Sequence, residues 1–119
     1  MNKNLLESSL TLTMYSLNSL YNGIAENDNL SQVADEYKIS FEDLENDGYK
    51  ALMKAKENKL DLESCKALFK KIDDTLENFQ EAVEMYKYSF SERDGTFEML
   101  NILMEMFDHM RWQAENCYE

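Results

Sequence analysis

The residues of this sequence best suited to chemistry are four carboxylates at regular spacing in its second half. Glu81 and Glu84 form an E-x-x-E pair, and after a stretch of 20 residues Glu105 and Asp108 form an E-x-x-D pair. Residues three apart are neighbours on the surface of a helix. Because carboxylate oxygens are ligands that Mg²⁺ takes, both pairs together are suited to a divalent cation, provided that they converge on one point.

These two motifs resemble the metal signature of the all-α nucleotide pyrophosphohydrolases, the MazG-like and dimeric dUTPase group. The resemblance covers residues 81–108 and implies that the four carboxylates hold Mg²⁺, which bridges a triphosphate for attack by water. The chain departs from the family's pattern at Phe107, where a glycine is expected before the second Asp. At 100° per residue, all four carboxylates point away from the seam between their two helices, so a metal site needs another helix or a second subunit.

Other catalytic arrangements are missing from the sequence. His109 is the only histidine, and no glutamate precedes it by three residues, so the di-iron E-x-x-H pattern is absent. The chain contains no G-x-S-x-G, no P-loop glycines and no zinc-ligand spacing, and Cys65 and Cys117 form no metal or redox motif. We therefore expect a protein that is not an enzyme and has no cofactor and no metal, with the pyrophosphohydrolase as the enzymatic alternative.

A heptad pattern of apolar residues predicts the two helices that carry these carboxylates. Apolar residues recur at steps of four and three between residues 65 and 90, and again between residues 100 and 117. That period places each set on one side of a helix. Asp61 and Thr96 are suited to cap the two helices, which we expect at 61–90 and 96–116. With a tight turn at 91–95, they should form a long C-terminal helical hairpin.

Three further helices are predicted upstream. The first runs from about residue 2 to 21 and ends at Asn22-Gly23, and a short second helix covers 30–38. Ser40 would then cap a third helix that ends near residue 58 and could split at Asp47-Gly48. The chain has no proline and 119 residues, which favours one domain over 1–119. The fold class is all-α, a mostly antiparallel four- or five-helix bundle in which helices two and three form an acidic flap.

The charge of the chain points to a protein partner. Net charge is −12, and residues 35–47 hold six carboxylates and one lysine. The spacing over residues 30–52 is close to a helix-turn-helix, but acids in the would-be recognition helix would repel phosphates, which excludes direct nucleic-acid binding. Carboxylates on a rigid helix can instead imitate a row of phosphates and steer a basic protein, although a solvated helix face is the alternative. The candidate partner-binding acids are Asp35, Glu36, Glu42, Asp43, Glu45 and Asp47.

Aromatic and methionine residues supply candidate contacts for that partner. The last predicted helix is apolar over a wide arc, and methionines suit adaptable contacts, while Trp, Tyr and Arg are common at binding hot spots. The candidates are Tyr15, Tyr88, Arg111 and Trp112. In the alternative interpretation, all of them except Tyr88 complete the core.

Glu7 and its polar neighbours interrupt any signal-like segment, and no apolar span of 18 residues occurs, so we expect a cytoplasmic protein without a membrane partner. The leading hypothesis is a small acidic inhibitor, of the immunity, antitoxin or phage anti-defence type, that occludes a basic site on a protein target such as a nucleic-acid-binding protein. The pyrophosphohydrolase remains one alternative. The other is a homodimeric assembly or chaperone subunit whose first or last helix is buried against a second copy.

Overall fold

The computed structural model describes residues 3–26, 30–85 and 96–116. These residues form helices without any strand, which confirms the all-α prediction. The four helices are α1 (Lys3–Ala25), α2 (Ser31–Lys56), α3 (Leu62–Met85) and α4 (Thr96–Asn116).

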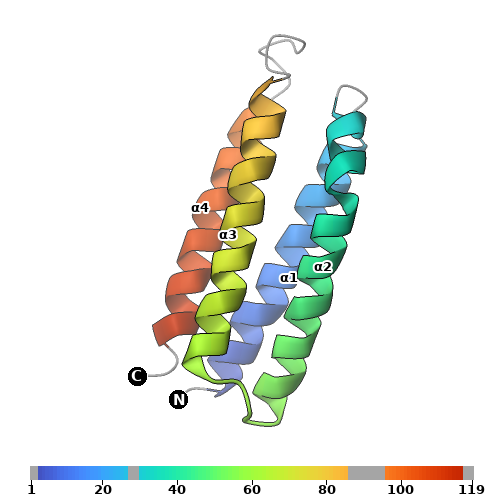
Figure 1. The fold of residues 1–119 in the computed structure, drawn as a ribbon. Helices are drawn as coiled ribbons and strands as arrows, with labels where there is room; N and C mark the ends of the chain where they lie inside the picture. Colours follow the sequence, from blue (N-terminus) through green and yellow to red (C-terminus); the bar gives the residue numbers. More distant parts are fainter. Residues whose placement is uncertain (1–2, 27–29, 86–95, 117–119) are drawn as a thin grey trace.

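The helices lie side by side along the long axis of a molecule that measures 46 × 23 × 18 Å (Figure 1). α1 packs on α2 and α4, and α3 packs on the same two helices. Each helix therefore has two neighbours and turns one face to a shared interior. Over the described ranges, no helix combines the length and the apolarity needed to cross a bilayer.

α2 is one continuous helix, so the predicted division into two helices at residues 38–40 is wrong. The helix also passes through Asp47-Gly48 without a break. Gly48 is buried, and a Cβ atom at this position would overlap the thioether of Met14 on α1. The glycine therefore permits a close approach of two helices rather than ending one. Because no turn interrupts residues 31–56, the helix-turn-helix interpretation is also wrong.

The helix ends agree in part with the sequence. α1 continues past the predicted stop at Gly23 to Ala25, because Ile24 extends its buried stripe. α2 ends with Asn58 at φ 59° and a hydrogen bond of 2.8 Å from the Lys59 amide to the Lys54 carbonyl, which is a Schellman closure. Asp61 caps α3 as predicted, since its Oδ1 accepts the Ser64 amide at 2.9 Å. Residues 86–90 of the predicted fourth helix and the turn at 91–95 lie outside the described residues.

The core contains side chains from all four helices. An aromatic cluster joins three of them: Phe41 of α2 lies 5.3 Å from Tyr21 of α1 and 5.2 Å from Phe79 of α3, measured between ring centroids. Tyr37 of α2 packs edge-on against Phe79 at 5.1 Å. α2 therefore contributes aromatic side chains to the core. The prediction that the helices of residues 30–58 form an acidic flap outside the core is wrong.

Candidate binding surface

The outer face of α1 carries almost no charge. Lys3 and Glu7 are the only ionisable residues of α1 apart from two tyrosines, so no acid or base follows Glu7 in this helix. Leu12 and Tyr15 are nonetheless exposed, by 55% and 72%. In a chain with net charge −12, this face therefore exposes apolar and aromatic groups rather than carboxylates.

A groove runs along the seam between α1 and α2, on one side of this face. Its volume is about 290 Å³, and Tyr15 and Tyr49 line it together with Glu45. A smaller groove of about 150 Å³ shares Glu45 and adds Glu42. The structure thus places Tyr15, Glu42 and Glu45, three of the predicted site residues, along one seam. Tyr49, which the sequence analysis did not single out, completes it.

A larger groove of about 500 Å³ lies on the surface between α1 and α4, beside the line where the two helices pack. Leu12 forms one wall, and Ile102 and Met106 form the other. Ile102, Met106 and His109 recur with the period of a helix, so the sequence alone predicts that they share one face. Only the structure shows that this face lies beside α1. The ring of Trp112, 63% exposed, stacks on that of His109 with centroids 6.3 Å apart.

The predicted acids of α2 do not form one surface. Glu42 and Glu45 lie toward α1, whereas Asp47 lies toward α3 and accepts a hydrogen bond from Lys71 Nζ at 2.5 Å. This hydrogen bond raises the pKa of Lys71, and the charges of Asp47 and Asp43 add to the effect. Asp35, Glu36, Glu42, Asp43 and Glu45 form no ion pair with any described residue.

Arg111 is engaged inside the molecule. Its guanidinium pairs with Asp73 of α3 and lies 3.4 Å from Asp108. The arginine therefore ties α4 to α3, which leaves it less free for the partner contact predicted from the sequence. Tyr88, another predicted contact, lies outside the described residues.

The carboxylates of the pyrophosphohydrolase resemblance are spread over two helices. Glu81 lies on α3, Glu105 and Asp108 lie on α4, and all three are exposed. The side chain of Glu84 is outside the described part of the structure. Among the described residues, no group of three His, Cys, Asp or Glu side chains could hold a metal ion.

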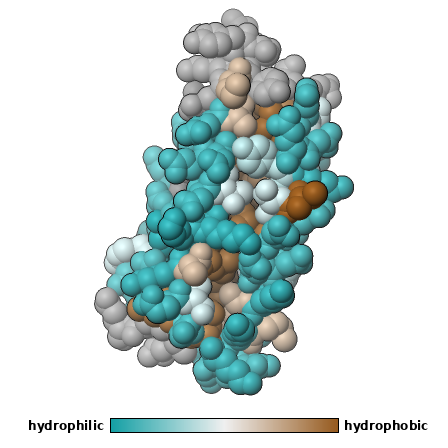
Figure 2. All heavy atoms as spheres, in the orientation of Figure 1, coloured by the Kyte–Doolittle hydropathy of each residue, from teal (hydrophilic) through white to brown (hydrophobic). Residues whose placement is uncertain are grey.

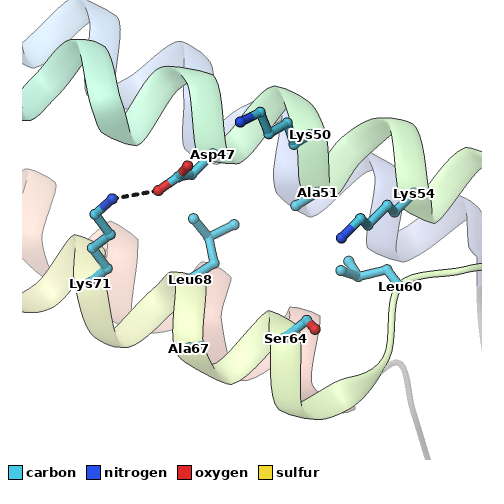
Figure 3. Close-up of a pocket in the computed structure, with 9 residues that line it drawn as sticks. All are labelled: Asp47, Lys50, Ala51, Lys54, Leu60, Ser64, Ala67, Leu68 and Lys71. Carbon is cyan, nitrogen blue, oxygen red and sulfur yellow. Dashed lines mark hydrogen bonds and ion pairs between the residues drawn. The ribbon is translucent and has the colours of Figure 1, made fainter.

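A basic region that the sequence analysis missed lies where α2 ends and α3 begins. Residues 50–71 hold seven lysines and three carboxylates, a net charge of +4. Lys50, Lys54 and Lys71 surround a pocket of about 280 Å³ with an apolar floor that includes Leu68 (Figure 3). Figure 2 shows apolar atoms in the groove between α2 and α3, with hydrophilic side chains on both sides of it. The sequence analysis missed this region because the acids that precede it give the middle of the chain a negative total charge.

The chain matches no protein-family model, and neither the curated proteins nor the solved structures contain a significant match.

Proposed function

We propose that this protein is a non-enzymatic, acidic protein-binding module, a small inhibitor of the immunity, antitoxin or phage anti-defence type. Its target carries a basic surface, such as the nucleic-acid site of a binding protein, and the inhibitor occludes that surface. The observation that carries the proposal is the seam between α1 and α2. There Glu45 lies beside the exposed rings of Tyr15 and Tyr49, and Glu42 lies in the adjoining groove; neither carboxylate pairs with a described cation.

The two kinds of side chain have separate roles in this proposal. The carboxylates attract a basic target from a distance and pair with its lysines or arginines, which raises the association rate. The tyrosine rings supply large contact area at low entropic cost and slow dissociation, as aromatic anchors of interfaces do. Because α1 presents no carboxylates beside these rings, the described charge that contact there covers is that of Glu45 on α2, which a lysine or arginine of the target pairs with.

The proposal also includes the helix arrangement and the cellular location that the sequence predicts. The helices are a mostly antiparallel bundle that ends in a long hairpin of α3 and α4, and the cytoplasm is the place of action. Tyr15 belongs to α1, which has one groove on its α2 side and another on its α4 side. Because a helix holds a side chain in place better than a loop does, the ring is preorganised for binding.

The test is affinity capture of the tagged protein's target from a lysate of its host at low salt, with three matched variants. Tyr15→Ala/Tyr49→Ala removes the rings, and Glu42→Gln/Glu45→Gln removes the seam charges. The control, Glu63→Gln/Glu77→Gln, removes the same number of charges from exposed positions on α3.

The expected result is a stoichiometric basic protein that salt releases, that the control retains, and that both seam variants lose. The charge variant should act mainly through the association rate and the tyrosine variant mainly through dissociation. Equal capture by all three variants would refute the seam as the binding surface, and capture of no basic protein would refute the proposal itself.

A further inference from the structure

Charge is divided along the exposed face of α2. Its first half carries the acids of residues 35–47, with a net charge of −5, whereas residues 50–56 hold three lysines and no carboxylate. Both halves belong to one uninterrupted helix of 26 residues. At a rise of 1.5 Å per residue the helix is about 39 Å long, and along it an acidic segment is followed by a basic one.

The outermost line of this helix also carries apolar side chains. Ile39 and Met53 are exposed by 72% and 57%, and Asn46 lies midway between them, seven residues from each. All three fall within about 20° of one direction on the helix, which points away from the buried face. Figure 2 shows an apolar patch over α2 among hydrophilic side chains.

We propose that the outer face of α2 binds the same face of a second copy, antiparallel, about a two-fold axis at Asn46. Residues equally far before and after Asn46 then face each other. Ile39 packs against Met53 of the second copy, and the reciprocal contact forms on the other side of the axis. Asn46 meets its own equivalent, and a central asparagine that pairs with itself is a known way to fix helix register.

Charge complementarity selects this orientation. On one flank of the outermost line, Asp43 comes within one residue of Lys50 of the second copy, and Glu36 comes within a turn of Lys54 of the second copy. Asp35 reaches Lys56 of the second copy on the other flank. A parallel pair would place acids against acids and lysines against lysines. Asp35 and Glu36 form no ion pair with any described residue of their own chain, and Asp43 interacts with Lys71 only through its charge, so the second copy displaces no hydrogen-bonded pair of these carboxylates.

The overall charge of −12 does not prevent this contact. At physiological ionic strength the Debye length is about 8 Å, so repulsion between the distant parts of two copies is screened while contact pairs are not. The inference does not rest on the proposed function. The second copy covers Glu36 and Asp43 and also comes close to Glu42 and Tyr49, which lie as near to the outermost line as Lys50 and Asp43 do, but it leaves Tyr15 accessible on α1. Self-association and target binding therefore share part of α2 and should compete.

Disulfide trapping at the two-fold axis tests the arrangement. A residue facing its own equivalent across packed helices has Cα atoms roughly 5 Å apart, within the range for a disulfide. In a Cys117→Ser background, we expect Asn46→Cys to form a cross-linked dimer in glutathione buffer at least about tenfold faster than Glu77→Cys, an exposed control on α3. Circular dichroism verifies that each variant is folded.

Charge reversal then tests the orientation in the same assay. Lys50→Glu/Lys54→Glu should reduce the cross-linking rate of the Asn46→Cys protein to that of the control, and adding Glu36→Lys/Asp43→Lys should restore it. Equal rates at positions 46 and 77 would overturn the inference, as would trapping that charge reversal does not slow. A dimer seen by ultracentrifugation that position 46 fails to trap would also overturn it, and would point to the groove between α1 and α4.

Discussion

Two pairs of neighbouring helices in this molecule illustrate two kinds of described contact. Between α1 and α2 the contacts are apolar and close, because Tyr21 packs on Phe41 and the missing side chain of Gly48 admits Met14. Between α3 and α4 the structure describes two polar links: Arg111 pairs with Asp73, and Gln80 donates a hydrogen bond of 2.9 Å to Asn101.

The two kinds of contact differ in how much free energy of unfolding they contribute. Burial of apolar surface contributes in proportion to area and is insensitive to salt, whereas a solvent-accessible ion pair contributes about 0–1 kcal/mol and is screened. We therefore expect substitutions at the interface of α1 and α2 to reduce stability more than those in the polar links between α3 and α4.

The largest effect is expected for Phe41→Ala. The ring is buried and contacts aromatic rings of both α1 and α3, so its removal leaves a cavity at the centre of the core. We expect a loss of about 3–5 kcal/mol in the free energy of unfolding, measured by urea denaturation. Tyr15→Ala, a truncation of an exposed ring, is the control and should change stability by less than about 0.5 kcal/mol. Similar losses in both variants would contradict a core centred on this cluster.

Gly48→Ala should follow. Alanine favours a helix over glycine by about 1 kcal/mol, but here its Cβ displaces Met14, and we expect a net loss of about 1–2 kcal/mol. Gly23→Ala is the matched control, because Gly23 is exposed within α1 and the same substitution there should stabilise the protein by about 0.5–1 kcal/mol.

A double-mutant cycle locates the cause of the Gly48 effect. In a Met14→Ala background the displaced thioether is gone, so Gly48→Ala should become neutral or stabilising. A loss that persists in this background would show that the glycine is needed for some other reason.

Arg111→Met tests the polar side of the comparison. The arginine is partly buried and pairs with Asp73, so we expect a loss of about 1 kcal/mol at low salt that diminishes in 1 M NaCl. Lys70→Met, which breaks the more exposed pair with Asp74, should have a smaller effect. A loss at Arg111 that is independent of salt would assign it to packing of the long side chain instead.

Features that depend on local periodicity could be predicted from the sequence, whereas features that depend on contact between two helices could not. The heptad stripe of α3 and the cap at Asp61 were predicted, because burial on a helix and an N-cap follow from residues a few positions apart. Ser40 was predicted to cap a new helix because serine is a favoured N-cap residue, and Gly48 was predicted to break a helix because glycine is a poor helix former. Packing of α2 against α1 outweighs these propensities, and such packing depends on residues distant in the sequence.

The same limit applies to the candidate surface. Tyr15 and the acids of α2 were singled out by residue type, but only the arrangement of α1 and α2 shows that Glu45 lies beside Tyr15 while Asp47 pairs with Lys71. Arg111 was predicted to be a contact because its type is common at interfaces. Its position opposite Asp73 depends on the register of α3 and α4, which no local pattern specifies.

The smallest effect is expected at the start of α3 and is visible through pH. The side-chain and backbone hydrogen bonds of Ser64 lower the pKa of Asp61 below its ordinary value of 3.8. Because the folded-state pKa is the lower one, the cap's contribution is complete above 3.8 and is lost as the pH falls through the lowered value. Asp61→Asn keeps a capping oxygen but cannot titrate. The melting temperature of the wild type should therefore fall relative to that of this variant as the pH falls below about 3.8.

Ser64→Ala separates the cap from other acid effects. It removes the hydrogen bond that contributes most to the lowered pKa and leaves the backbone amide in place, so its pH profile should lie between those of the wild type and Asp61→Asn. Identical profiles in all three proteins would mean that the start of α3 is held by burial of Cys65 and Leu68 rather than by its cap. In that case apolar packing would determine stability on this side of the molecule too, and the contrast between the two helix pairs would be confined to the links between α3 and α4.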